Sequence, residues 1–154
     1  MEEVVKRLIE LKKTISTMES CTGGAIVNSI TNIEGSSEII KFSAVTYSNE
    51  FKIKMGVSED TINKYSVYSM EVANEMSKTI SLYTNSDYSI GVTGKLNRVD
   101  TNNLYGDDST VFISIYIKDK DEFINSIVKV NKQTREDNKQ LIINEVRDKL
   151  LSIL

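Results

Sequence analysis

The 154-residue sequence contains no histidine, and this absence removes several kinds of active site. A Ser-His-Asp triad, a Cys-His dyad and the common histidine-ligated zinc site all require an imidazole. Because Cys21 is the single cysteine, the chain can form neither an internal disulfide nor a thiolate-rich metal site. We therefore expect any hydrolytic chemistry to use lysine, tyrosine, a carboxylate or a hydroxyl, with no metal and no cofactor.

Long apolar runs and a dominant charge are also missing. No stretch approaches the roughly 18 to 20 apolar residues that cross a bilayer, and the first residues lack the basic and apolar segments of a secretion signal. The 19 Lys and Arg residues nearly balance the 22 Asp and Glu residues, for a formal net charge of -3. Such a balance creates no field that gathers a polyanion. We expect a cytoplasmic protein that binds neither membranes nor nucleic acid.

The chain length suits one domain with a substantial hydrophobic core. Hydrophobic residues make up 40% of the sequence and charged residues 27%, which is typical of folded proteins. No repeat, linker or low-complexity segment divides the chain. We therefore interpret residues 1–154 as a single domain.

Helical and strand-like patterns alternate along the chain, which predicts an α/β fold. Helices are expected over residues 2–13, after residue 24, after Ser48, over 58–64, after Ser69 and from about residue 133. Strands are expected over residues 14–18, 39–47, 87–93, 110–117 and 123–130, the last two as an antiparallel hairpin. The predicted buried faces of the first, fifth and last helices are Val4-Leu8-Leu11, Val72-Met76-Ile80-Tyr83 and Ile143-Val146-Leu150-Leu154.

Ser20 lies at the predicted junction of a strand and a helix, in the segment Glu19-Ser20-Cys21-Thr22-Gly23-Gly24. Free amides at a helix start can bind an anion or a developing oxyanion, which suits a nucleophilic serine. The glycines would allow a substrate to approach the backbone closely. The same pattern also fits a simple helix cap by Ser20 or Thr22, and the local pattern alone favours that interpretation.

Lys52 is a second candidate, on a short helix that follows the predicted strand 39–47. A partly desolvated lysine has a lowered pKa and can take a proton from a serine, which replaces the missing histidine. Most lysines on short helices instead face water, and the residue alone favours that alternative.

Together these segments resemble the CinA carboxy-terminal family of nicotinamide-nucleotide amidohydrolases. The resemblance is strongest over residues 14–94 and becomes weaker beyond them. The matching segments, in order, are Met18-Glu19-Ser20-Cys21-Thr22-Gly23-Gly24, Gly35-Ser36-Ser37, Val45-Thr46-Tyr47-Ser48-Asn49-Glu50-Phe51-Lys52, Gly56-Val57, Val67-Tyr68-Ser69-Met70-Glu71-Val72-Ala73 and Val92-Thr93-Gly94.

The resemblance implies a three-layer α/β/α sandwich with a mixed, mostly parallel sheet. It implies hydrolysis of the carboxamide of nicotinamide mononucleotide to nicotinic acid mononucleotide and ammonia, with Ser20 as nucleophile and Lys52 as general base. Tyr47 would assist proton transfer or orient the lysine. Arg135 would hold the phosphate, although a solvated arginine at a helix start fits its position nearly as well. The remaining implied substrate-binding positions are Glu19, Thr22, Gly23, Asn49, Thr93 and Gly94. The expected partners are a pyridine nucleotide and further copies of the chain.

The chain departs from the family pattern after Gly94. The family continues with a loop rich in glycine and proline, whereas residues 95–108 are polar and contain Lys95 and Arg98 as their only cations. These cations would approach the phosphate, or the loop would simply be a variable, solvated one. A catalytically inactive or substrate-altered member, acting as a nucleotide-binding or oligomerising module, is the alternative function.

Overall fold

The computed structural model describes residues 1–154, in which five strands form one sheet in the order β2-β1-β3-β4-β5. The strands are β1 (Ile15–Glu19), β2 (Ala44–Val45), β3 (Tyr88–Gly94), β4 (Thr110–Ile117) and β5 (Glu122–Lys129). Strand β1 pairs in parallel with β2 and β3, whereas β4 is antiparallel to β3 and β5. Only β4 therefore runs against the other strands, which agrees with the expected mixed sheet.

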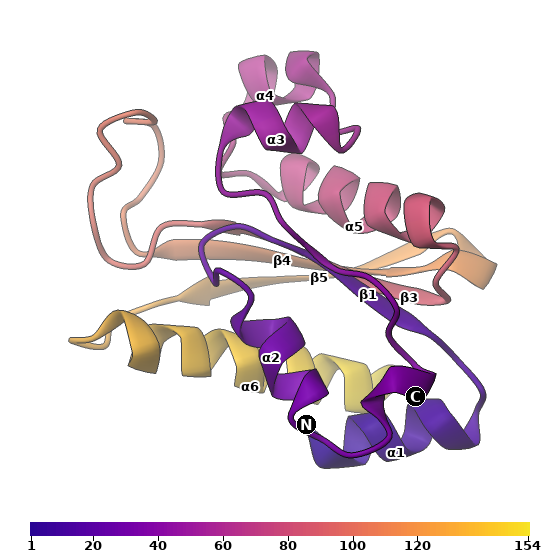
Figure 1. The fold of residues 1–154 in the computed structure, drawn as a ribbon. Helices are drawn as coiled ribbons and strands as arrows, with labels where there is room; N and C mark the ends of the chain where they lie inside the picture. The colour runs from indigo at the N-terminus through magenta and orange to yellow at the C-terminus, as the bar shows by residue number, and fades with distance from the viewer.

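Helices cover both faces of this sheet, so the predicted three-layer sandwich is confirmed (Figure 1). One layer holds α1 (Glu2–Glu10), α2 (Ala25–Thr31) and α6 (Arg135–Ile153). The opposite layer holds α3 (Asn49–Lys54), α4 (Glu59–Tyr65) and α5 (Met70–Thr84). Two short 3₁₀ turns, η1 (Ser36–Glu38) and η2 (Lys118–Lys120), complete the regular structure. None of these helices combines the length and apolar content needed to cross a membrane.

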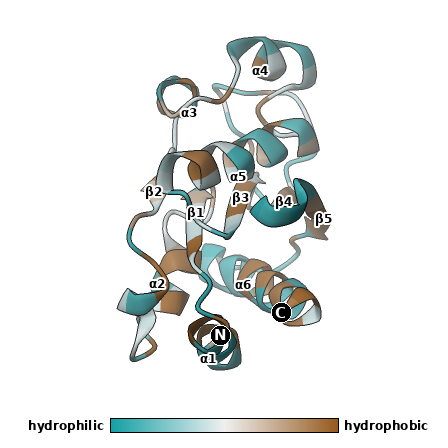
Figure 2. Cartoon of the chain, turned by 90° about the vertical axis from the view of Figure 1, so that its right-hand side faces the viewer, coloured by the Kyte–Doolittle hydropathy of each residue, from teal (hydrophilic) through white to brown (hydrophobic).

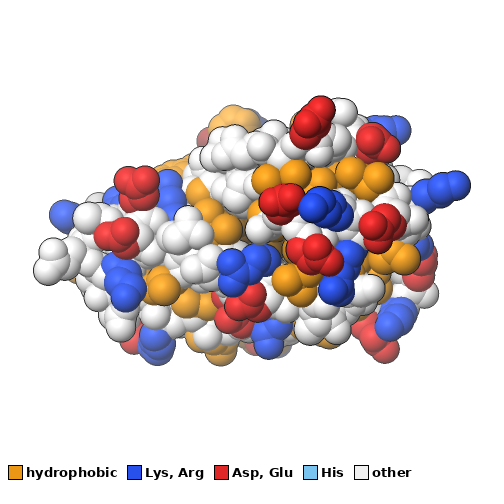
Figure 3. Space-filling view, turned by 90° about the horizontal axis from the view of Figure 1, so that it is seen from below, with side chains coloured by type: hydrophobic (Ala, Val, Ile, Leu, Met, Phe, Trp, Pro, Cys, Tyr) orange, Lys and Arg blue, Asp and Glu red, His pale blue; other side chains and the backbone are white.

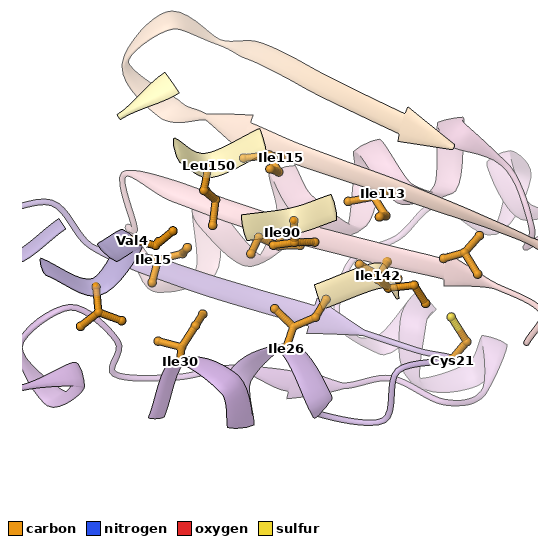
Figure 4. Packing of buried hydrophobic residues seen from close by; sticks show 14 of the residues in the cluster. Val4, Ile15, Cys21, Ile26, Ile30, Ile90, Ile113, Ile115, Ile142 and Leu150 are labelled. Atoms are coloured by element: carbon orange, nitrogen blue, oxygen red, sulfur yellow. The ribbon is translucent and has the colours of Figure 1, made fainter. Parts of the chain in front are cut away.

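The larger hydrophobic core lies between the sheet and α1, α2 and α6 (Figure 4). Alternate residues of the strands point to this face, so Ile90 and Val92 of β3 meet the same helices as Ile113 and Ile115 of β4. In Figure 2, brown and teal alternate along α1 and α6, as expected for helices with one buried face. Charges of both signs intermingle on the face of the molecule that Figure 3 shows.

The second face of the sheet packs against α5 at very short range. A Cβ atom on Gly91 of β3 would lie 2.2 Å from the carbonyl oxygen of Ala73 in α5, so only glycine fits there. Small polar side chains fill the rest of this contact. Ser89 Oγ donates to the Ser77 carbonyl at 2.7 Å, and the hydroxyls of Ser77 and Ser114 lie 2.9 Å apart.

Three predicted helix faces needed small corrections. Leu11 is half-exposed because α1 ends at Glu10, and Val5 takes its place in the core. Tyr83 lies on the outer side of α5 and is exposed. In α6, Ile142 rather than Ile143 is fully buried, beside Val146 and Leu150. Adjacent apolar residues make the rotation of a helix ambiguous in the sequence, and packing resolves it.

The predicted strand over 39–47 was wrong in length, because only Ala44–Val45 forms a ladder, at the edge of the sheet. Ser43 Oγ accepts the Thr17 N–H at 3.0 Å, so a side chain replaces a backbone carbonyl just before the strand. The helices expected after Ser48 and Ser69 are present, and these serines cap them, since their hydroxyls accept the amides of Phe51 and Val72. The 95–108 loop contains no helix or strand, as expected.

Candidate active site

A cavity of about 530 Å³ opens at the carboxyl ends of β1 and β3. After β1 the chain crosses to β2 on one side, while β3 lies on the other side, so the connections diverge at this point. Such a switch point leaves a crevice outside the strand ends, where open α/β sheets bind ligands. The cavity is lined by Ser20, Cys21, Tyr47, Ser48, Asn49, Tyr68, Gly94, Lys95, Leu96, Arg98, Val99, Asp100, Asn102, Asn103 and Arg135.

Lys52 lies directly behind Ser20 in this cavity. The lysine Nζ is 3.0 Å from Ser20 Oγ and donates a hydrogen bond to the Thr46 carbonyl oxygen at 2.8 Å. Lys52 is only 1% exposed, although it lies on a short helix at the surface layer. The alternative of a solvated lysine is therefore wrong, and the structure brings the two predicted catalytic side chains into hydrogen-bond contact.

Burial is the main influence on the protonation of Lys52. It lowers the pKa of the ammonium group from 10.5 to about 8, because a charge is poorly solvated there. A thiolate at Cys21 would act in the opposite direction, and the negative charge of Asp100 does so, less strongly than burial. At pH 7 roughly a tenth of Lys52 is consequently a neutral amine, with a lone pair that can accept the Ser20 proton.

Cys21 also borders the cavity, but its chemistry differs from that of Ser20. Its side chain lies at the end of the larger core, near Ile26 and Ile142 in Figure 4. Burial raises the pKa of this thiol to about 12, so it remains protonated at neutral pH. Because the thiolate is the reactive form of cysteine, Cys21 is a poor nucleophile here.

Glu19 does not reach the cavity. Its fully buried carboxylate accepts the amides of Gly24, Ile26 and Val27 at 2.8 to 3.1 Å, and so caps α2. Helix α2 begins at Ala25, five positions after Ser20, and the Gly24 backbone is left-handed. The alternative of a Ser20 or Thr22 cap is therefore wrong. The helix amides expected to face an oxyanion are already occupied by Glu19.

Tyr47 and Arg135 form a pair at the rim of the cavity. Arg135 Nη2 donates to the Tyr47 hydroxyl at 3.3 Å, and Tyr47 is 65% exposed. Lys52 hydrogen-bonds the Ser20 hydroxyl and the Thr46 carbonyl rather than Tyr47, so the structure shows no contact by which the tyrosine would orient the lysine, and its role in proton transfer stays a prediction. Arg135 is the first residue of α6, and its guanidinium faces the same cavity as Ser20.

The other predicted binding residues divide into two groups. Asn49 and Gly94 line the cavity. Thr22 and Thr93 are fully buried behind the wall, and Thr93 donates its hydroxyl to the Val67 carbonyl at 2.9 Å. Gly23 has a φ of +62°, a left-handed turn conformation that favours glycine, and lies outside the cavity wall. The structure therefore gives these three residues a place in the scaffold rather than on the wall.

The loop after β3 contributes side chains that the sequence did not single out. Asp100 and Asn103 line the cavity together with Tyr68, which precedes α5. Lys95 is buried and paired with Asp108 at 2.9 Å. This cation is therefore not free to bind a phosphate, contrary to the role that its position in the sequence suggested. The cluster of Asn and Asp in a long polar loop was the available signal in the sequence. The order of residues along the chain could not show which side chains these residues contact.

Comparison with known proteins links this chain to one family. The family model described as the CinA C-terminal domain matches residues 1–154. A Clostridium beijerinckii protein described as competence-damage inducible is 46% identical over 122 residues, which is 78% of this chain and 30% of the relative. A CinA-like protein of Flavobacterium psychrophilum is 44% identical over 113 residues, 71% of this chain and 26% of that protein. The chain thus spans less than a third of these relatives.

Solved structures extend the likeness to the fold. A CinA superfamily protein from Escherichia coli superimposes with a TM-score of 0.87 at 24% identity, covering 99% of this chain and 90% of that one. A competence/damage inducible protein from Agrobacterium tumefaciens gives a TM-score of 0.85 at 23% identity, covering 98% and 93%. With the family model matched over the whole length, the chain belongs to the CinA C-terminal domain family.

Proposed function

We propose that the protein is an amidohydrolase that converts nicotinamide mononucleotide to nicotinic acid mononucleotide and ammonia by a Ser20/Lys52 mechanism. The observation that carries this proposal is the contact between Lys52 Nζ and Ser20 Oγ at 3.0 Å, at the wall of an open cavity. Nucleophile and base within hydrogen-bond reach are the minimum requirement for covalent catalysis by serine.

In the proposed reaction, the neutral Lys52 amine takes the hydroxyl proton while Ser20 Oγ attacks the carboxamide carbon. The tetrahedral intermediate collapses when the C–N bond breaks, and the proton held by Lys52 passes to the departing ammonia. A water then attacks the acyl-enzyme with Lys52 again as base, and the acid product leaves Ser20 free. The second proton transfer restores the amine for another cycle.

The turn after Ser20 supplies donors for the intermediate's oxyanion. The Ser20 amide is bonded to the Val92 carbonyl at 3.0 Å, whereas the Cys21 and Thr22 amides have no acceptor within the chain. An amide next to the nucleophile is well suited to stabilise the developing negative charge. We assign this role to Cys21 first, because it directly follows Ser20.

The charge of the cavity supports an anionic substrate. Arg98 and Arg135 line it from the loop after β3 and from the start of α6, and Asp100 is the one acidic side chain of the wall. Guanidinium groups bind phosphate through paired N–H donors. A phosphate-bearing pyridine nucleotide fits this arrangement, and the cavity's size is in the range of small-molecule sites.

The test is incubation of purified protein with nicotinamide mononucleotide, followed by measurement of ammonia and of nicotinic acid mononucleotide. Equal amounts of both products are expected from the wild type and none from Ser20→Ala. If the nucleotide binds but neither product forms, the protein is the alternative, a non-catalytic nucleotide-binding member. A chain that neither binds nor hydrolyses the nucleotide contradicts the proposed substrate.

A further inference from the structure

The loop from Lys95 to Asp108 departs from the family pattern, yet it supplies nearly half of the cavity wall. It joins β3 to β4 and stands off the end of the sheet in Figure 1. Leu96 is its one buried apolar side chain, while Val99, Leu104 and Tyr105 are exposed. A loop with so little apolar burial needs specific polar contacts to keep its position.

Asp100 is the centre of those contacts. Its carboxylate accepts the Tyr68 hydroxyl, the Asn103 side-chain amide at 2.9 Å and the Asn102 backbone amide at 2.9 Å. Asn103 in turn accepts the side-chain amide of Asn49 at 3.2 Å. Tyr68 precedes α5 and Asn49 begins α3, so one carboxylate connects the loop to two helices that border the cavity.

A second set of contacts closes the base of the loop around the same tyrosine. Lys95 and Asp108, the first and last loop residues, form an ion pair at 2.9 Å. The Lys95 ammonium also lies 5.3 Å from the centroid of the Tyr68 ring. The Lys95 side chain is only 2% exposed, whereas that of Asp108 is 42% exposed, so the pair joins the two ends of the loop at the surface with the ammonium on its buried side.

We propose that Asp100 is a positioning residue of the active site, which latches the 95–108 loop, as the wall of the substrate cavity, against Tyr68 directly and against Asn49 through Asn103. The latch itself is a property of the fold, and its effect on turnover rests on the proposed function. With the latch broken, the loop moves away and takes Arg98 from the cavity that it lines together with Arg135. The bound nucleotide then loses the contacts that this wall provides.

Asp100 also carries the only negative charge of the cavity wall, which acts on Lys52. This charge favours the ammonium form and so opposes the burial that lowers the lysine pKa. Cys21 is the other titratable group that acts on Lys52, and its thiol is neutral near pH 7. Removal of the Asp100 charge therefore makes Lys52 easier to deprotonate.

The first test is amide hydrogen exchange over residues 96–103 in the wild type, Asp100→Asn and Tyr68→Phe. Both variants are nearly isosteric and each removes a latch hydrogen bond, so exchange there is expected to accelerate roughly fivefold or more. Asp107→Asn is the matched control, because Asp107 lies in the same loop but bonds Lys129 and Ser109 outside the cavity. Unchanged exchange in both Asp100→Asn and Tyr68→Phe overturns the latch.

The second test is the pH dependence of Ser20 labelling by a fluorophosphonate, together with the KM for nicotinamide mononucleotide. Asp100→Asn is expected to lower the midpoint pH of labelling and to raise KM, whereas Tyr68→Phe raises KM and lowers the midpoint less, because Asp100 keeps its charge. Asp107→Asn changes neither. A midpoint for Asp100→Asn equal to that of Asp107→Asn overturns the positioning role. A wild type that shows neither labelling nor deamidation contradicts the proposed function instead, and the exchange result still decides the latch.

Discussion

Lys52 Nζ and Ser20 Oγ lie 3.0 Å apart, although 32 positions separate the two residues. Ser20 directly follows the inner strand β1, and Lys52 lies on α3 after the edge strand β2. Because β1 and β2 are parallel, their carboxyl ends meet at one edge of the sheet. The result is a buried amine beside a hydroxyl, and the first three predictions follow from it.

Ser20→Ala is expected to lower kcat/KM for nicotinamide mononucleotide by at least about a thousandfold, because the acyl-enzyme can no longer form. Its free energy of unfolding should fall by no more than about 1 kcal/mol, the contribution of one hydrogen bond. Cys21→Ala is the control, and we expect it to keep turnover within roughly tenfold of the wild type. Comparable activity in Ser20→Ala and the wild type would exclude Ser20 as nucleophile.

Lys52→Arg is expected to lose activity by roughly a hundredfold to ten-thousandfold, although it keeps the positive charge, because a guanidinium cannot act as base near neutral pH. In the wild type, kcat/KM should rise with pH through about 8, where Lys52 loses its proton. A pH–rate profile with chemistry shown to be rate-limiting checks this. A flat profile between pH 6 and 10 would contradict the role of Lys52.

Lys52→Met is expected to stabilise the protein at pH 7 by about 1 to 3 kcal/mol, since it removes a buried ammonium at the expense of two hydrogen bonds. The folded pKa is about 8 and the ordinary value 10.5, so between these pH values the unfolded wild type holds a proton that the native state has released. Raising the pH through this window therefore stabilises the wild type.

The difference in free energy of unfolding between Lys52→Met and the wild type should consequently stay constant below about pH 8. It should decrease between about pH 8 and about pH 10.5. Urea unfolding at a series of pH values measures it. If this difference in stability instead increased above pH 8, the pKa of Lys52 in the folded protein would not be lower than in the unfolded chain. Lys54→Met is a suitable control, because Lys54 lies on the same helix and is exposed.

Arg98→Ala combined with Arg135→Ala is expected to raise KM for nicotinamide mononucleotide roughly tenfold or more, with little change for the dephosphorylated riboside. Both guanidinium groups line the cavity, and each charge-assisted hydrogen bond to phosphate contributes about 1.5 to 3 kcal/mol. Arg147→Ala, on the outer side of α6 beside Asp148, is the matched control. Equal effects on both substrates would remove phosphate recognition from these two residues.

Gly91→Ala is expected to destabilise the fold by roughly 3 kcal/mol or more, because its Cβ would overlap the Ala73 carbonyl oxygen and no rotamer relieves a backbone contact. Ser89→Ala on the same strand face is the comparison, with an expected cost of about 1 kcal/mol for its hydrogen bond to Ser77. Chemical unfolding of both variants decides this. Similar small losses would mean that α5 can move away from β3.

Much of the fold could be predicted because it depends on local sequence patterns. The alternation of helix and strand, the hairpin of β4 and β5 and the caps at Ser48 and Ser69 depend on neighbouring residues. Edge strand β2 could not be predicted in length, because a side chain of Ser43 interrupts the ladder. The rotation of α6 was also ambiguous, since Ile142 and Ile143 are adjacent and equally apolar.

The sequence by itself determined which chemistry is available. Without histidine, a proton acceptor for Ser20 must be another side chain, and the segments around Ser20 and Lys52 indicated both candidates. Only the tertiary structure decided that Lys52 is buried against Ser20, that Glu19 caps α2 behind the cavity and that Asp100 contacts Tyr68. These contacts join residues from separate elements. Their distances and burial depend on how the sheet and its two helical layers pack, and no local pattern encodes that packing.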